Sequence, residues 1–125
     1  MEFPEAAKSG FKHYATFSGR ATRSEYWYWV LFIILVSAGM RVLDVVAFGA
    51  NIHDPGTLYP LSTLFSLTTL LPSLAVAARR LHDINRSGWW LLILLIPLIG
   101  FIVFLVWACQ ESNPGDNQYG PQPVG

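Results

Sequence analysis

The stretch RRLHDINRSGWW, from Arg79 to Trp90, separates two long apolar runs, and its role decides the fold. The flanking runs, 61–78 and 89–109, contain no aspartate, glutamate, lysine or arginine. Each is about long enough to cross a hydrocarbon core of ~30 Å at ~1.5 Å per residue. A soluble helix of ordinary length would carry a polar face, which neither run has. We therefore predict that this stretch is a turn between two membrane helices.

Every polar residue type in this turn suits a structural role at the end of a helix. Asp83 follows Arg79 by four residues and precedes Arg86 by three, so it can pair with either along a helical extension. Asn85 tolerates the left-handed conformation that ends helices. Ser87 can cap the start of the next helix. The turn therefore needs no catalytic explanation.

The composition of the 125-residue chain supports a membrane protein of one domain, 1–125. Hydrophobic residues make up 53% and charged residues only 13%, whereas a soluble domain carries roughly a quarter charged residues. The net charge of zero gives no indication of a nucleic-acid partner. The single cysteine, Cys109, leaves no pair for an intrachain disulfide. The first 24 residues lack a continuous apolar segment, so we expect no cleavable signal peptide.

Three membrane-spanning helices are predicted, at about residues 25–47, 59–80 and 88–109. Pro97 lies inside the third, and membrane helices tolerate such a proline more readily than soluble ones. A re-entrant hairpin turning near Pro97 is disfavoured, because each half would hold only about eight residues. The polar residues 110–125, rich in proline and glycine, predict a mobile tail.

An amphipathic segment precedes these spans. Residues 3–17 have an apolar stripe at helical spacing and polar residues on the other side. This pattern predicts a short helix on the membrane surface; the alternative is a helix packed on protein. The stripe consists of Phe3, Ala7, Phe11, Tyr14 and Phe17.

Local signals mark the ends and the contacts of the first two spans. Thr22 and Glu25 fit a capping box that begins the first span. Arg41 and Asp44 lie near its far end as expected partners at the interface, with a buried ion pair as the alternative. Residues 49–56 predict a turn-rich loop. The second span carries a stripe of small residues that lets helices approach closely: Ser62, Ser66, Thr69, Ser73 and Ala77.

The positive charges are distributed unevenly about the predicted spans. Seven of the eight lysines and arginines precede the first span or border the turn between the second and third. The positive-inside rule then places the N-terminus and the 81–87 loop in the cytoplasm and the C-terminus outside. These seven residues are Lys8, Lys12, Arg20, Arg23, Arg79, Arg80 and Arg86.

The cations and their neighbours predict a basic cytoplasmic rim. Such a rim can engage anionic phospholipid headgroups or a membrane-protein partner, and a homo-oligomer is a further expectation. Tryptophans just below the rim would anchor the helices at headgroup level. The candidate binding residues are Arg20, Arg23, Glu25, Trp27, Arg79, Arg80, His82, Asp83, Arg86, Trp89 and Trp90.

Catalysis, a metal and a cofactor are not expected. His82 and Asp83 are adjacent, so on a helix their side chains point about 100° apart and form no ready dyad. The histidines are predicted on opposite sides of the membrane, which leaves no ligand cluster. We therefore favour a non-enzymatic membrane module, and an enzyme acting on lipid through His82 and Asp83 is the weakest hypothesis.

A subunit of an oligomeric transporter or channel is the main alternative. Pro72 and Pro97 interrupt two spans, and broken membrane helices often line substrate sites. The apolar runs 61–78 and 89–109 within these spans, however, contain no aspartate, glutamate, lysine, arginine or histidine that could relay an ion or a proton. Three spans would also have to oligomerise to enclose a path.

Three motifs occur in order along the chain: FSGRATRSEYW (17–27), RRLHDINRSGWW (79–90) together with IPLIG (96–100), and NPGDNQYGPQP (113–123). They resemble the YhaH/YhaI-like small inner-membrane proteins of bacteria, a family filed as a domain of unknown function. The resemblance covers nearly the whole chain, and Thr22 stands where the family usually has a basic residue. It implies the bacterial inner membrane and brings no activity, substrate or catalytic residue.

Overall fold

The structure, a computed structural model, describes residues 2–49 and 59–123. Within these ranges every regular element is a helix, which confirms the predicted all-α class. The predicted loop at 49–56 lies outside the described residues apart from Gly49. The elements are α1 (Phe3–Lys12), α2 (Arg23–Phe48), α3 (Pro60–Asp83), the 3-10 helix η1 (Gly88–Leu95) and α4 (Ile99–Ala108).

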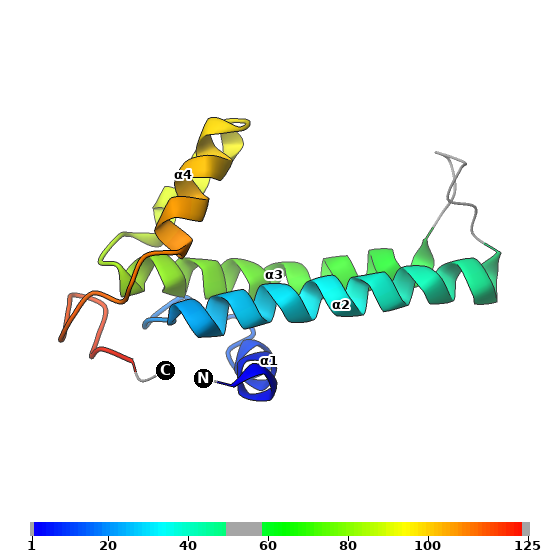
Figure 1. Ribbon diagram of the computed structural model, residues 1–125, viewed down its shortest axis with the longest axis horizontal. Helices are drawn as coiled ribbons and strands as arrows, with labels where there is room; N and C mark the ends of the chain where they lie inside the picture. The colour runs from blue at the N-terminus through cyan, green and yellow to red at the C-terminus, as the bar shows by residue number, and fades with distance from the viewer. Residues whose placement is uncertain (1, 50–58, 124–125) are drawn as a thin grey trace.

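Helices α2 and α3 form a long antiparallel pair (Figure 1). They contain 26 and 24 residues, which corresponds to ~39 and ~36 Å of helix. Both are long and apolar enough to cross a membrane. Only 6% of the most apolar stretch of α2 is buried, whereas the core helix of a soluble protein is mostly buried. These helices correspond to the first two predicted spans.

The start of α2 confirms part of the predicted capping box. Thr22 is the N-cap, and its hydroxyl accepts a hydrogen bond from the backbone N–H of Glu25 at 3.2 Å. The Glu25 carboxylate does not complete the box, because it binds side chains of other helices. At the far end, Gly49 adopts a left-handed conformation with φ of 68°, as helix-ending glycines do.

Asp44 of α2 caps the first turn of α3. Its carboxylate is fully buried and accepts the backbone N–H groups of Leu61 at 2.9 Å and Ser62 at 3.0 Å. The guanidinium group of Arg41 lies 4.6 Å from the centre of the Tyr59 ring. The direct partners of Asp44 are therefore orphan N–H groups at a helix start, and the predicted pairing with Arg41 is corrected.

The stripe of small residues on α3 lies largely at its contact with α2. Ser66 is exposed, and the other four residues of the stripe are buried or half-buried. Trp29 of α2 donates from Nε1 to the hydroxyl of Ser73 at 3.1 Å. Small side chains let the two backbones approach, as predicted for a membrane interface.

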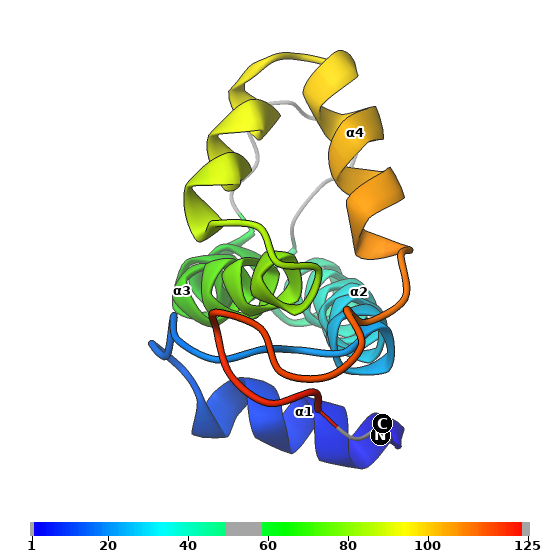
Figure 2. The same cartoon turned by 90° about the vertical axis from the view of Figure 1, so that its left-hand side faces the viewer.

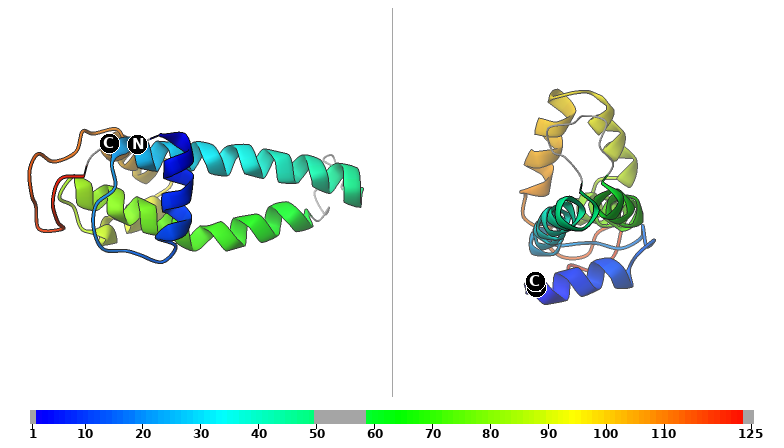
Figure 3. Two further views of the ribbon diagram at one scale, coloured as in Figure 1. Left: turned by 90° about the horizontal axis from the view of Figure 1, so that it is seen from below. Right: turned by 90° about the vertical axis from the view of Figure 1, so that its right-hand side faces the viewer.

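Helix α1 lies across the α2–α3 pair (Figure 3), and it ends before the predicted limit of 3–17. Ala6 and Gly10 are buried. A Cβ at Gly10 would lie 2.2 Å from ring carbons of Trp29, so only glycine permits this approach. The Phe11 ring packs edge-on against Trp29 with 5.2 Å between ring centres. Helix α1 is therefore packed on protein, as the alternative interpretation predicted.

The third predicted span is not one helix. Helices η1 and α4 form a hairpin on the face of the α2–α3 pair opposite α1 (Figure 2). The chain turns at Pro97 and at Leu98, which has a φ of 64°. The predictions of a continuous span at 88–109 and of no hairpin near Pro97 are therefore wrong, and two candidate spans remain.

The hairpin is possible because its turn satisfies backbone groups locally. Pro97 has no N–H to leave unpaired. The N–H groups of Ile96 and Gly100 donate to the carbonyls of Ile93 at 3.0 Å and Ile96 at 3.1 Å. At the start of η1, the predicted cap is confirmed, since the Ser87 hydroxyl accepts the N–H of Trp89 at 3.3 Å.

Gly100→Ala is expected to destabilise the hairpin by about 1–3 kcal/mol, the usual cost of overpacking. A Cβ at Gly100 would lie 1.7 Å from the carbonyl oxygen of Ile93, a backbone atom that cannot swing away. The control is Gly39→Ala in α2, where an added Cβ meets no atom within 4 Å. Unfolding titrations in mixed micelles measure both. Equal stability of the two variants would contradict the close contact of η1 and α4.

Candidate functional site

A cluster of charged side chains is buried where α2 begins and α3 ends, at the left of Figure 1. Each member is less than a tenth exposed, and the cluster holds three guanidinium groups and two carboxylates. These residues were predicted to form an outward basic rim with their neighbours. The charged cluster consists of Arg20, Glu25, Arg79, Arg80 and Asp83.

Asp83 is the centre of the charged cluster. Its side chain is fully buried, and Oδ1 accepts from Nε of Arg20 at 3.0 Å. Oδ2 accepts from Nη1 of Arg80 and from the hydroxyl of Ser112, each at 2.5 Å. The predicted partners, Arg79 and Arg86, are not the ones it binds.

Glu25 connects three helices through one carboxylate oxygen. Its Oε1 accepts from Nη1 of Arg79 on α3 at 3.1 Å and from the hydroxyl of Ser9 on α1 at 2.5 Å. Within the described part of the chain, Nε and Nη2 of Arg79 have no hydrogen-bond partner. The Arg79–Glu25 pair therefore joins the surface helix to the two long helices.

Backbone carbonyls of the tail accept further hydrogen bonds from Arg20 and Arg80. Arg20 donates from Nη1 to the carbonyl of Gly115 at 2.8 Å and from Nη2 to that of Asn113 at 2.5 Å. Arg80 donates from Nη2 to the carbonyl of Gln110. Residues 110–115, predicted as part of a mobile tail, thus complete the charged cluster.

The tail also packs directly on the last turn of α3. The backbone N–H of Asn113 donates to the carbonyl of Asp83 at 2.9 Å. The side chain of Asn117 donates to the carbonyl of His82 at 3.0 Å. The ring of Tyr119 stacks on His82, with 4.0 Å between ring centres and 3° between planes. The prediction that a membrane separates the tail from the 81–87 loop is therefore wrong, because the hairpin returns the chain to the same end.

The predicted basic rim is not a continuous surface. Arg20, Arg79 and Arg80 bind carboxylates and carbonyls inside the protein, where lipid headgroups do not reach. Arg23 is exposed and donates to the carbonyl of Cys109 at 3.2 Å. Arg86 is half-buried.

Trp27, Trp90 and Arg86 contact the C-terminal end of α4. Trp27 donates from Nε1 to the carbonyl of Ala108 at 3.0 Å. The Arg86 guanidinium lies 4.5 Å from the centre of the Trp107 ring. The Trp90 ring contacts the same ring edge-on, and Trp89 is 79% exposed. The predicted site thus consists of a buried ionic part and an aromatic part, which meet at the carbonyl of Ala108, where both Arg80 and Trp27 donate.

His82 and Asp83 face different partners. Nδ1 of His82 is 2.9 Å from the carbonyl oxygen of Gly19, whereas Asp83 binds arginines and Ser112. Across residues 2–49 and 59–123, no three histidine, cysteine, aspartate or glutamate side chains gather in a way that could hold a metal ion.

Sequence reasoning missed Ser9, Ser112 and the tail carbonyls. The proline and glycine content of the tail predicted mobility, but the motif at 113–123 was itself a sign that the tail makes specific contacts. A segment that only needs to be mobile requires no particular order of residues. A search for acceptors to match three arginines and two carboxylates would also have pointed to backbone carbonyls.

Two outward cations lie on α1, away from the charged cluster. Lys8 and Lys12 are exposed, while Ala6 and Gly10 are buried against the long helices. Two positions along a helix correspond to a rotation of about 200°, so the lysines occupy the face opposite the buried residues. They are one turn apart and therefore neighbours on that face.

Comparison with known proteins finds a family and several relatives. Residues 14–121 match the family described as "Protein of unknown function (DUF805)". The chain is 44% identical over 116 residues to "Inner membrane protein YhaI" of Escherichia coli (strain K12), covering 92% of each chain. It is 40% identical over 112 residues to "Inner membrane protein YhaH" of the same strain, covering 90% of each. No solved structure matches the chain.

Proposed function

Because the chain belongs to the family described as "Protein of unknown function (DUF805)", we propose that it is a non-enzymatic module of the bacterial inner membrane. Its two long helices cross the bilayer, and the lysines of α1 hold the charged end against anionic lipid headgroups. The charged cluster holds α1 in its orientation, because Glu25 binds both Ser9 of α1 and Arg79 of α3. The observation that carries this proposal is the position of Lys8 and Lys12 on the outer face of α1.

The exposed surface of the long helices supports insertion into lipid. Ile34 of α2 is 59% exposed, and Leu64 and Leu67 of α3 are 65% and 67% exposed. Large contiguous apolar surfaces are rare on soluble monomers and mark membrane or protein contacts. In hydrocarbon such side chains need no cover, so the same surface is stable in a bilayer.

The orientation follows from the charges and from the contact of the tail. Seven of the eight lysines and arginines lie in α1, in the linker to α2, at the start of α2, in the last turns of α3, or at the bend after α3. The positive-inside rule favours the cytoplasm for that end of the α2–α3 pair. We therefore place α1, the bend and the tail together in the cytoplasm, with Arg41 towards the opposite face.

The position of α1 supports contact with headgroups. It lies across α2 and α3 (Figure 3). Because we propose that these two helices cross the membrane, the axis of α1 lies along the membrane surface. Phe11 is 44% exposed and Tyr14 is 36% exposed beside the two lysines. Aromatic and basic side chains together are typical of helices at a lipid interface.

Lys8→Gln with Lys12→Gln is expected to weaken association with phosphatidylglycerol by roughly fivefold for each lysine, as for charges near an anionic surface. Spin-labelled lipid measures the relative association constant for the full chain in bilayers. The matched control is Glu5→Gln on the same exposed helix, which should raise that constant or leave it unchanged. An unchanged constant in the double lysine variant at moderate salt would reject headgroup binding by α1.

One observation supports the alternative of an oligomeric transporter or channel. Leu95 is 78% exposed and Leu98 is 71% exposed at the tip of the η1–α4 hairpin. Non-helical backbone at membrane depth is tolerated where protein covers it or where it lines a cavity, and a second copy would provide that cover. Two spans cannot enclose a path alone. A strict monomer in mild detergent would therefore exclude this alternative.

A further inference from the structure

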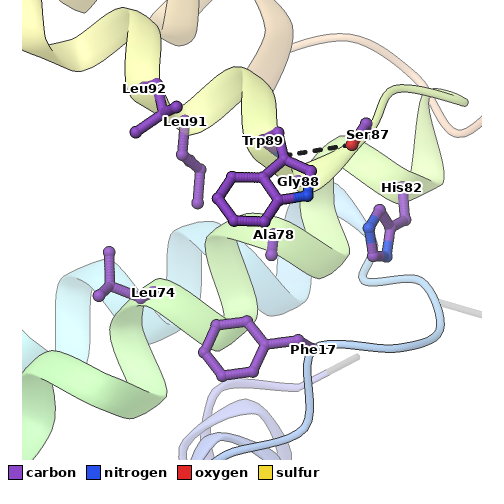
Figure 4. Close-up of a pocket in the computed structure, with 9 residues that line it drawn as sticks. All are labelled: Phe17, Leu74, Ala78, His82, Ser87, Gly88, Trp89, Leu91 and Leu92. Carbon is purple, nitrogen blue, oxygen red and sulfur yellow. Dashed lines mark hydrogen bonds between the residues drawn. The ribbon is translucent and has the colours of Figure 1, made fainter.

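A cavity of about 440 Å³ lies between the linker after α1, helix α3 and helix η1 (Figure 4). Its mouth is formed by apolar side chains that are themselves partly exposed: Phe17 at 43%, Leu74 at 41%, Trp89 at 79% and Leu92 at 58%. The volume falls within the range of roughly 300–1,000 Å³ that ligand sites occupy. The cavity is separate from the charged cluster and from the lysines of α1.

The cavity has a polar end and an apolar end. Leu74 and His82 both line it and are eight residues apart on α3, which corresponds to ~12 Å along the helix. His82 lies at the end of α3 that contacts the tail, whereas Leu74 lies deeper in the proposed membrane layer. A ligand filling the cavity would therefore have its polar group towards the cytoplasmic end and its apolar part within the bilayer.

The surroundings of the mouth decide what occupies the apolar end. This step depends on the proposed insertion of α2 and α3 into the membrane. There the neighbouring molecules are lipid acyl chains rather than water. An apolar cavity does not hold water, and an empty one forfeits dispersion contacts along its lining. An acyl chain from the adjacent leaflet is therefore the natural occupant.

The chemistry of His82 decides what suits the polar end. A carbonyl oxygen only accepts, so the contact of Nδ1 with the Gly19 carbonyl places a hydrogen on Nδ1. In the neutral imidazole Nε2 is then an acceptor. A Cβ built at Gly88, which also lines the cavity, would be 3.5 Å from Nε2. No described residue donates to Nε2, so a ligand with a hydroxyl or ammonium donor matches it.

We propose that this cavity binds a membrane phospholipid. The acyl chain lies against Leu74 and Leu92, and a hydroxyl or ammonium group of the head region donates to Nε2 of His82. Phosphatidylethanolamine and phosphatidylglycerol carry such donors, whereas phosphatidylcholine carries none. The site recognises a donor and a chain, so it differs from the charge-based contact proposed for α1.

The apolar end is tested by photolabelling of the full chain in bilayers that contain phosphatidylethanolamine with a photoactivatable acyl chain. Labelling should concentrate on residues that line the cavity and fall severalfold in Leu74→Trp, which blocks the mouth. The control is Leu70→Trp, one turn earlier on α3 and 56% exposed outside the cavity. Equal labelling in the two variants would overturn the proposal.

The polar end is tested by comparing phosphatidylethanolamine with phosphatidylcholine. One hydrogen bond should give the wild type a preference of roughly twofold to tenfold for the lipid with a donor. His82→Asn retains a donor for Gly19 but lacks Nε2, so the preference should disappear while chain labelling remains. Equal labelling by both lipids in the wild type would overturn the assignment of His82.

These outcomes are independent of the headgroup contact at α1. Replacing Lys8 and Lys12 should leave the cavity labelling unchanged, and Leu74→Trp should leave the phosphatidylglycerol constant unchanged. Resistance of the wild type to alkaline extraction tests membrane insertion itself. Extraction of the protein would overturn both proposals, whereas uniform labelling of an inserted protein would overturn the cavity alone.

Discussion

Asp83→Asn is expected to lower the free energy of unfolding by about 3–5 kcal/mol, the range for breaking a buried ion pair. The substitution keeps the size of the side chain and removes its charge. Arg20 and Arg80 are buried, and Asp83 is the carboxylate bound to both. Without that carboxylate, both guanidinium groups would be left buried with no opposite charge bound to them.

The same variant should release the tail, which gives the experiment a second readout. Asn113 binds the backbone of Asp83, and Ser112 binds its side chain. Unfolding titrations in mixed micelles measure stability, and limited proteolysis measures access to residues 110–123. The control is Asp116→Asn, an exposed carboxylate in the tail itself. If Asp83→Asn behaved like this control in both measurements, the charged cluster could not hold the tail.

The second prediction concerns the labelling of cysteines from one side of the membrane, where each position should react fully or not at all. In a Cys109→Ser background, Ser18→Cys and Gln118→Cys should react with an impermeant maleimide from the cytoplasmic side only. Both positions are exposed, and both adjoin segments that are hydrogen-bonded to the same end of the bundle. Inverted vesicles should therefore label both, and intact spheroplasts neither.

A position at the far end of α2 provides the control for this experiment. Phe48 is 61% exposed there, so Phe48→Cys should react in spheroplasts and be protected in inverted vesicles. Labelling of positions 18 and 118 from opposite sides of the membrane would show that residues 88–109 cross it as a third span. It would also separate Arg20 from the tail carbonyls that it binds, so the charged cluster could not form.

Part of the site could be predicted because it depends on local sequence. The hydroxyl of Thr22 caps α2 because both groups lie within one turn. Asn85 has a φ of 61°, as expected of a residue that ends a helix in the left-handed conformation. The small residues of α3 face α2 because their spacing puts them on one side of the helix. In each case the interacting group lies a few positions away in the sequence, or the helical repeat determines which face of the helix the residues share.

The burial of the arginines could not be predicted in this way. The positive-inside pattern identifies which residues gather at one end, but outward and inward arginines give the same pattern. Arg20 and Asp83 are 63 positions apart, and Arg20 and Gly115 are 95 apart. Such pairs depend on the path of the chain between them, which here includes the reversal at Pro97.

The order of the residues is enough to show that this chain is helical, that α2 and α3 are long and apolar enough to cross a bilayer, and that its cations gather at one end. Whether residues 88–109 continue through the membrane or fold back depends on contacts between distant parts of the folded chain. A run of apolar residues is compatible with either a spanning helix or a hairpin, since both arrangements keep its apolar side chains in lipid. The close contact at Gly100 and the ion pairs of Asp83 distinguish them, because each joins groups that meet only after the chain has folded.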